Sequence, residues 1–149
     1  MLKTPTLRID RVLLDVDAQD CSGALKAITD DFAASGLAKS SRKLHDALAL
    51  REKACSTALG NGIAIPHARV TGVDRPLLSF ERLKQAIPMG AADGCDVDLI
   101  VAIVSPVDDP GEHVKLLASL ARRLQDPACL EILRSAKSEA AVRAAFESV

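Results

Sequence analysis

His67 is the residue whose surroundings most favour chemistry. It directly follows residues 60–66, GNGIAIP, in which a short β-branched stretch lies between a turn and a proline. The glycines on both sides of Asn61 permit positive φ, so the chain can fold back on the segment before it. Pro66 lacks an N–H and fixes φ, so it should end the short strand 63–65 at a sheet edge or surface. An imidazole at a strand end titrates near neutrality and is a nucleophile, so it can accept a group and release it again.

Three polar side chains shortly before this run suit a phosphoryl group. Arg51 offers a fork of N–H donors, and Ser56 and Thr57 offer hydroxyls that can rotate. We therefore predict that these three side chains surround a phosphate carried by His67. From the residues alone, an alternative stays open, in which His67 is a surface-turn histidine that merely finds a hydrogen-bond partner.

The elements before the site should deliver Arg51 to it. Residues 11–16 are rich in branched apolar side chains and predict a strand. A helix should follow, capped by Asp20 or Ser22 and stopped at Gly36. A second helix, starting at residue 40 or 41, should run out near the arginine and leave it at a helix end.

The second half of the chain continues with strands and helices. Residues 77–83 begin apolar and then alternate, which predicts a strand that leaves the core toward water, and the almost unbroken apolar run 97–104 predicts the central strand. Residues 109–112, DPGE, have the form of a capped helix start, and two shorter helices should follow over 127–133 and from Ser138. This order of elements predicts a layered α/β domain.

The chain has two other histidines. His113 lies in the first turn of the helix that starts at 109–112 and shares a stripe with Leu116 and Leu117, so the residues alone predict a buried histidine with a hydrogen bond. His45 lies within the second helix and is expected at the surface.

Composition excludes several classes of protein. A chain of 149 residues that is 48% apolar can bury a core as one domain, and it has no apolar run long enough to cross a bilayer or to form a signal peptide. A net charge of −1 and an aromatic share of 2% argue against a nucleic-acid binder. Four cysteines without C-x-x-C spacing favour reduced thiols, and the acids at 93, 96 and 98 are too few for a calcium loop. We therefore expect a cytoplasmic protein with no metal, no cofactor and no membrane insertion.

The run REKACSTALGNGIAIPHA, residues 51–68, resembles the signature of the fructose/mannitol-type IIA domains of the bacterial phosphoenolpyruvate-dependent phosphotransferase system. It is most similar to that of the free-standing nitrogen-regulatory IIA proteins. The resemblance covers nearly the whole chain and is strongest over 51–69 and 96–124. Cys55 and Ala68 stand where the family commonly has glycine, and Ala68 makes positive φ less favourable there.

The resemblance implies roles for both site histidines. His67 would accept a phosphoryl group at Nε2 from an HPr-type phosphocarrier protein, with Nδ1 donating elsewhere. His113, within the segment EHVKLL, would hydrogen-bond or orient that group. The family also implies a mixed β-sheet flanked by helices on both faces, as a single three-layer domain over residues 1–149.

Transfer between two histidines needs positioning and charge neutralisation, which Arg51, His113 and the Ser56 and Thr57 hydroxyls would supply. Phosphorylation adds between one and two negative charges, so the two forms should bind different proteins. The nitrogen-regulatory branch implies targets in nitrogen, carbon and potassium homeostasis.

A docking partner also requires an apolar patch around His67, which we expect to include Ile65, Ala68 and Val70. Two alternative functions stay open, namely a sugar-specific (fructose/mannitol) transport IIA component and a regulatory binding module with the same fold that is not phosphorylated. The chain ends just after the IIA-like region, which favours the regulatory carrier. The presence of Arg51 and both site histidines weighs against the pure binding module.

Overall fold

The computed structural model describes residues 7–147 of the chain. In chain order, the elements are β1 (Arg11–Val16), α1 (Cys21–Ala34), α2 (Ser41–Ala54), β2 (Ala58–Gly60), β3 (Ile63–Ala64), β4 (His67–Val70), β5 (Leu77–Ile87), β6 (Val97–Pro106), α3 (Pro110–Arg123), α4 (Pro127–Ser135) and α5 (Glu139–Glu147). The predicted helix caps are confirmed, since Asp20 accepts from the Gly23 N–H, Ser40 from Lys43 and Asp109 from Glu112.

The strands form one mixed sheet in the order β1-β5-β6-β3-β2, and β4 pairs with β6 beyond the end of β3. The β1/β5, β3/β6 and β4/β6 pairs are parallel, whereas β5/β6 and β2/β3 are antiparallel. The predicted central position of β6 is confirmed, because this strand has neighbours on both sides and is almost entirely buried.

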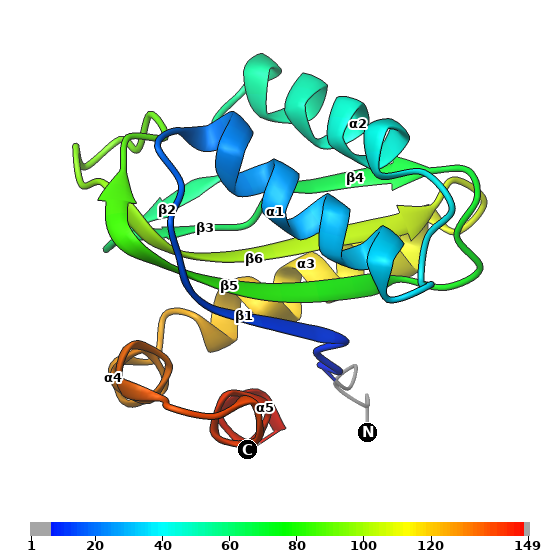
Figure 1. Cartoon of the computed structure of the whole chain (residues 1–149). Helices are drawn as coiled ribbons and strands as arrows, with labels where there is room; N and C mark the ends of the chain where they lie inside the picture. Colours follow the sequence, from blue (N-terminus) through cyan, green and yellow to red (C-terminus); the bar gives the residue numbers. More distant parts are fainter. Residues whose placement is uncertain (1–6, 148–149) are drawn as a thin grey trace.

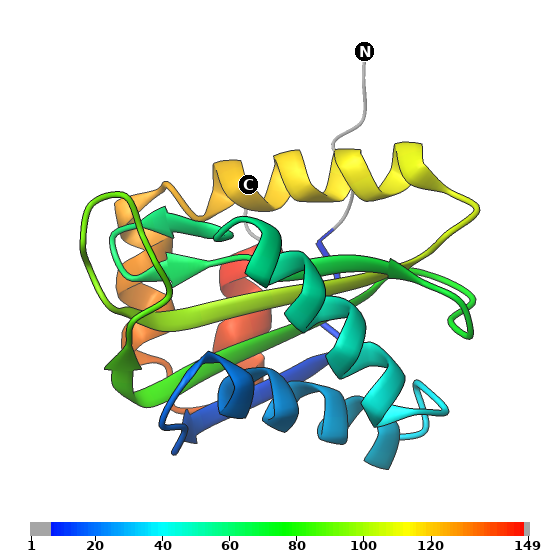
Figure 2. The ribbon, with the colours of Figure 1, turned by 90° about the horizontal axis from the view of Figure 1, so that it is seen from above.

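Helices cover both faces of the sheet, as predicted. Figure 1 shows α1 and α2 above the sheet and α3, α4 and α5 below it. Seen from above, α3 runs alongside the sheet edge that holds β2, β3 and β4, whereas α1 lies toward β1 (Figure 2). In residues 7–147, no helix is long and apolar enough to span a membrane.

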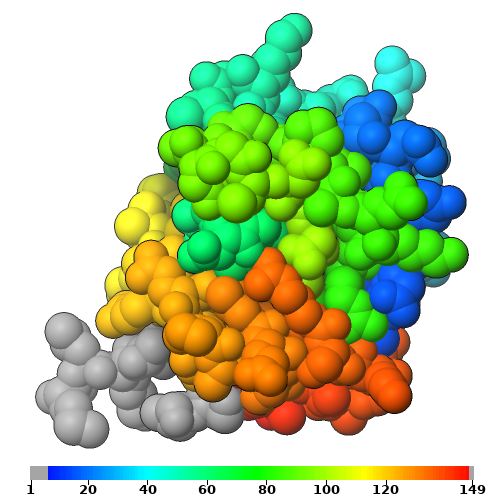
Figure 3. All heavy atoms as spheres, turned by 90° about the vertical axis from the view of Figure 1, so that its left-hand side faces the viewer, coloured from blue at the N-terminus to red at the C-terminus, as the bar shows by residue number. Residues whose placement is uncertain are grey.

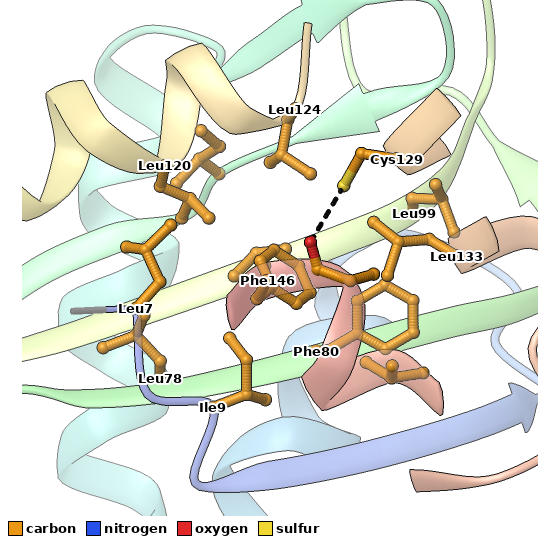
Figure 4. Packing of buried hydrophobic residues seen from close by; sticks show 14 of the residues in the cluster. Leu7, Ile9, Leu78, Phe80, Leu99, Leu120, Leu124, Cys129, Leu133 and Phe146 are labelled. Carbon is orange, nitrogen blue, oxygen red and sulfur yellow. Dashed lines mark hydrogen bonds between the residues drawn. The ribbon is translucent and has the colours of Figure 1, made fainter. Parts of the chain in front are cut away.

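Each face of the sheet has its own apolar core. Below the sheet, Phe80 meets Phe146 edge to face with ring centroids 6.0 Å apart, inside the cluster drawn in Figure 4. Above the sheet, Phe32 and Ile28 of α1 pack with Leu48 of α2 against the other side of the strands. These two cores hold α2 and α3 on opposite faces of β6, with the β4 edge between them.

The β2–β3 turn directly precedes the site and is tightly fixed. Gly60, Asn61 and Gly62 all have positive φ, as the sequence predicts. A Cβ on Gly62 would lie 2.7 Å from Arg134 Nη2 and 2.8 Å from Asp98 Oδ1, so a side chain cannot be added here without displacing this ion pair. Figure 3 shows the turn enclosed between the loop before β6 and α4.

Two expectations about the strands were wrong. The sequence did not reveal β2 or β4, because both are short and carry no clear alternation. Residues 77–83 do not leave the core toward water, since Glu81 is 0% exposed and the strand extends to Ile87. The reason is that helices cover both faces of the first half of β5, which buries Ser79 and Glu81, and the strand reaches solvent only at residues 84–86.

Candidate functional site

His67 is the first residue of β4. β3 and β4 lie along the same side of β6, and Ile65 and Pro66 form the break between them. The Ile65 N–H donates to Thr57 O at 3.1 Å, and Pro66 O accepts from the Ile103 N–H at 2.9 Å. Backbone hydrogen bonds to two different segments therefore hold residues 65 and 66 in place. The predicted placement of His67 at a strand end is therefore correct.

The backbone fixes the protonation of the His67 ring. Nδ1 lies 2.8 Å from the carbonyl oxygen of Ile65, and a carbonyl can only accept, so Nδ1 carries the proton. Half-burial lowers the pKa of His67 despite the opposing effect of this bond, and the positive charge of Arg51 lowers it further. The ring is therefore neutral at pH 7, with a lone pair on Nε2.

His113 lies beside His67. The two ring centroids are 5.5 Å apart, with the ring planes tilted by 49°. His113 is only 7% exposed, and its Nδ1 lies 2.7 Å from the hydroxyl oxygen of Ser105 on β6. Burial lowers the pKa of His113, and the positive charge of Arg69 lowers it further, so this ring is also neutral. The sequence-based expectation of a buried, hydrogen-bonded histidine is confirmed.

Arg51 lies in the last turn of α2, where the sequence placed it at a helix end. Its Nη1 donates to the carbonyl of Cys55 at 2.8 Å, which holds the guanidinium over the loop that follows the helix. The positive charge of Arg51 also lowers the pKa of His67, and the ring of His67 in turn lies beside that of His113.

The hydroxyls of Ser56 and Thr57 have acceptors within the protein. Ser56 Oγ donates to Met89 O at 2.6 Å, and Thr57 Oγ1 donates to Glu52 Oε1 at 2.6 Å. The second Glu52 oxygen accepts from the Thr57 N–H at 2.7 Å. These hydrogen bonds stabilise the loop between α2 and β2. Direct binding of phosphate by Ser56 and Thr57 remains a prediction.

Three polar residues near the site were not singled out from the sequence. Ser105 contacts His113, and the charge of Arg69 lowers the pKa of His113. Glu52 accepts a hydrogen bond from Thr57, and its negative charge raises the pKa of His67, opposite to the effect of Arg51. Two features of the sequence could have indicated these residues. Ser105 ends an apolar strand, and Arg69 lies two residues after His67, on the same face of the strand.

The predicted docking patch was wrong in its residues. Ile65, Ala68 and Val70 are 3%, 9% and 4% exposed and belong to the cores. The large apolar side chains that do reach the surface next to site residues are Leu50, 72% exposed, and Val114, 63% exposed. β4 is covered by α2 on one face, which the sequence could not show. Ala68 lies within β4 without positive φ, so its difference from glycine leaves the strand intact.

The remaining candidate groups have structural roles. Asp98 pairs with Arg134, and Asp93 accepts from the backbone of Asn61 and Cys95. Within the described part of the chain, no group of three or more His, Cys, Asp and Glu side chains could hold a metal ion. The four cysteines are free thiols.

The site thus combines a neutral imidazole whose Nε2 is nucleophilic, a second imidazole beside it and two arginine charges. A nucleophilic nitrogen among cationic and N–H donors suits an incoming phosphoryl group, whose oxygens carry the negative charge.

Comparison with known proteins supports this chemistry. The sequence model of the family described as "Phosphoenolpyruvate-dependent sugar phosphotransferase system, EIIA 2" matches residues 6–149. A nitrogen regulatory protein of Klebsiella oxytoca is 37% identical over 125 residues, which cover 83% of this chain and 76% of the relative. A fructose-like EIIA component of the phosphotransferase system in Escherichia coli is 31% identical over 111 residues, 74% of this chain and 75% of that protein. The crystal structure of the nitrogen regulatory protein IIA-Ntr from Neisseria meningitidis superposes with a TM-score of 0.85 at 30% identity, covering 95% of this chain and 96% of that one.

Proposed function

Because the chain belongs to the EIIA 2 family of the phosphoenolpyruvate-dependent sugar phosphotransferase system, we propose that it carries a phosphoryl group on Nε2 of His67. The donor is a phosphohistidine carrier protein of the HPr type. The resulting phosphorylation state selects which regulatory proteins the chain binds in the cytoplasm.

The observation that carries this proposal is the 2.8 Å bond from His67 Nδ1 to the Ile65 carbonyl. It leaves the lone pair on Nε2 and keeps the proton away from the reacting nitrogen. In the transfer, the P–N bond to the carrier's histidine breaks, its electron pair stays on that histidine, and a new bond forms between phosphorus and His67 Nε2. The Nδ1 proton stays in its bond to Ile65 throughout, so the step needs no base.

Two kinds of group stabilise the transferred phosphoryl oxygens. Arg51 and Arg69 supply positive charge, since each acts electrostatically on one of the two histidines. His113 lies within 5.5 Å between ring centroids and supplies an N–H donor. A loose phosphoryl transition state needs mainly such positioning and charge, so no metal or organic cofactor enters this step.

Carrier docking needs apolar surface around the site. Leu50 and Val114 are both more than half exposed, and each is next in sequence to a site residue, Arg51 and His113 respectively. We assign the docking surface to these side chains in place of the buried Ile65, Ala68 and Val70. A phosphate on His67 adds up to two negative charges to the site, which changes the set of proteins that can bind there.

The regulatory role is favoured over sugar transport by the relatives. The nitrogen regulatory protein of Klebsiella oxytoca is 37% identical to this chain, against 31% for the fructose-like component. A sugar-specific transport component remains the second candidate, because the same site chemistry serves both. Transfer of phosphate onward to a sugar-specific IIB partner, in the presence of sugar, would favour that second role.

The proposal is tested by intact-mass measurement after incubation with phosphoenolpyruvate, the first enzyme of the system and an HPr-type carrier. We expect one acid-labile phosphate on the wild type, none on His67→Ala and one on His45→Ala, the control at a histidine outside the site. Absence of label on the wild type, while a known IIA protein is labelled in the same mixture, would overturn the proposal.

A further inference from the structure

The two site histidines present Nδ1 to different kinds of oxygen. His67 Nδ1 faces the Ile65 carbonyl at 2.8 Å, which can only accept, whereas His113 Nδ1 faces the Ser105 hydroxyl at 2.7 Å, which can accept or donate. The hydroxyl therefore leaves two proton arrangements for His113, and the surroundings of Ser105 decide between them.

We propose that Ser105 is a positioning residue that holds His113 as the Nε2–H tautomer, so that this ring donates to the phosphoryl group and cannot accept it. The effect of this tautomer on phosphoryl transfer rests on the proposed function. The tautomer itself is a property of the unphosphorylated protein and stands apart from that function.

Burial limits the hydrogen bonds that Ser105 can make. Ser105 is 0% exposed, and the His113 ring is the one hydrogen-bond partner of its hydroxyl within residues 7–147. If His113 Nδ1 carried the proton, it would donate to Ser105 Oγ, and the hydroxyl proton would have no acceptor in the described chain. A buried donor without an acceptor is costly, so that arrangement is disfavoured.

The other arrangement satisfies both groups. Ser105 donates its hydroxyl proton to the lone pair on His113 Nδ1, and the single proton of the neutral ring lies on Nε2. The ring is neutral because burial and the positive charge of Arg69 lower its pKa. His113 Nε2, on the opposite side of the ring from Ser105, is then an N–H donor.

The two adjacent rings therefore have different roles in the transfer. His67 has its proton on Nδ1 and a nucleophilic Nε2, and His113 has its proton on Nε2 and no free lone pair there. The two imidazoles, 5.5 Å apart, are thus a phosphoryl acceptor and a hydrogen-bond donor. Ser105 thereby selects which of the two histidines is phosphorylated.

A direct test is long-range ¹H–¹⁵N correlation NMR of the unphosphorylated protein with ¹⁵N-labelled histidine at neutral pH. We expect a pyrrole-like Nε2 and a pyridine-like Nδ1 for His113, and the reverse for His67. A protonated Nδ1 on His113 would overturn the inference, even if His67 is phosphorylated normally. Failure of the protein to accept phosphate would overturn the proposed function and leave this spectrum unaffected.

Substitutions give a second readout. Ser105→Ala removes the donor, so the His113 signals should shift toward mixed tautomers and the phosphoryl acceptance rate at saturating carrier should fall about tenfold with KM unchanged. Ser105→Thr keeps a hydroxyl and should restore the Nε2–H tautomer and the rate. Ser79→Ala, at a buried serine on the neighbouring strand, is the matched control and should change neither. A wild-type tautomer and rate in Ser105→Ala would overturn the inference, and if that variant does not fold, the wild-type spectrum decides alone.

Discussion

Two adjacent strands each bury a serine at 0% exposure, with opposite outcomes. On β6, Ser105 is bonded to His113. On β5, Ser79 and the carboxyl oxygens of Glu81 are equally buried but have no hydrogen-bond partner among the described residues. Where a partner is present, it fixes the position of a proton. Where it is absent, the Ser79 hydroxyl is left unsatisfied, and burial raises the pKa of Glu81 to about 8.

The buried polar groups next to His67 are hydrogen-bonded, whereas those of β5 destabilise the fold. In the β4–β6 cluster, made of His67, Ile65 O, His113 and Ser105, the Nδ1 atom of each ring is paired, so both rings are held in place. The β5 pair, Ser79 and Glu81, lowers stability without any partner to stabilise it. Changes in the first cluster should therefore alter transfer, and changes in the second should alter stability.

The largest effect is expected at Glu81. The folded chain holds the carboxyl neutral up to about pH 8, whereas the unfolded chain ionises near the ordinary value of 4.5. Between these pH values the unfolded state releases a proton that the folded state keeps, so the wild type should lose up to about 5 kcal/mol of stability as pH rises. Glu81→Gln cannot ionise, so its advantage over the wild type should grow across this window in urea unfolding experiments. Glu131→Gln, at an exposed site, is the control, and parallel pH curves for wild type and Glu81→Gln would contradict the assignment.

Removing the second histidine should slow transfer strongly. His113→Ala deletes the N–H donor beside the phosphoryl group, and we expect the acceptance rate to fall about a hundredfold, while the protein can still be labelled to completion. Rapid-quench labelling with His45→Ala as control measures this. A wild-type rate would remove His113 from the mechanism.

The charge of Arg51 can be separated from its fork of donors. Arg51→Lys keeps the charge and loses the planar guanidinium that bonds to Cys55 O, so we expect a rate about tenfold lower, with the low pKa of His67 retained. Lys53→Ala, in the same last turn of α2, should leave the rate unchanged. An unchanged rate in Arg51→Lys would mean that the positive charge alone matters at this position.

The smallest effect is expected at Ser79. Because its hydroxyl has no partner among residues 7–147, Ser79→Ala should be neutral or stabilise the protein by up to about 1 kcal/mol, whereas Ser105→Ala should cost about 1–3 kcal/mol by leaving the imidazole nitrogen unpaired. Chemical denaturation of both variants measures the difference. Equal losses of stability would remove the distinction between the two strands.

Local patterns predicted those parts of the molecule whose causes are local. The caps at Asp20, Ser40 and Asp109 and the turn around Asn61 depend on residues within a few positions, so the sequence placed the helices and His67 correctly. The central strand followed from its unbroken apolar run.

Features that depend on tertiary contacts could not be predicted in this way. Ser105 meets His113 only because α3 returns to the face of β6, and the acceptor of the Ser56 hydroxyl, Met89 O, lies 33 residues away. Glu81 follows a pattern typical of a strand that reaches water, and only the helices packed over β5 bury it. Period and spacing carry no information about which distant element covers a side chain.

The central claim is that Nε2 of His67 is the atom that takes the phosphoryl group. The most direct measurement is NMR of the phosphorylated, ¹⁵N-histidine-labelled protein, in which coupling to phosphorus identifies the modified nitrogen. We predict coupling to Nε2 of His67, with its Nδ1 still protonated and bonded to Ile65 O. Phosphorus on Nδ1 of His67, or on either nitrogen of His113, would contradict the account.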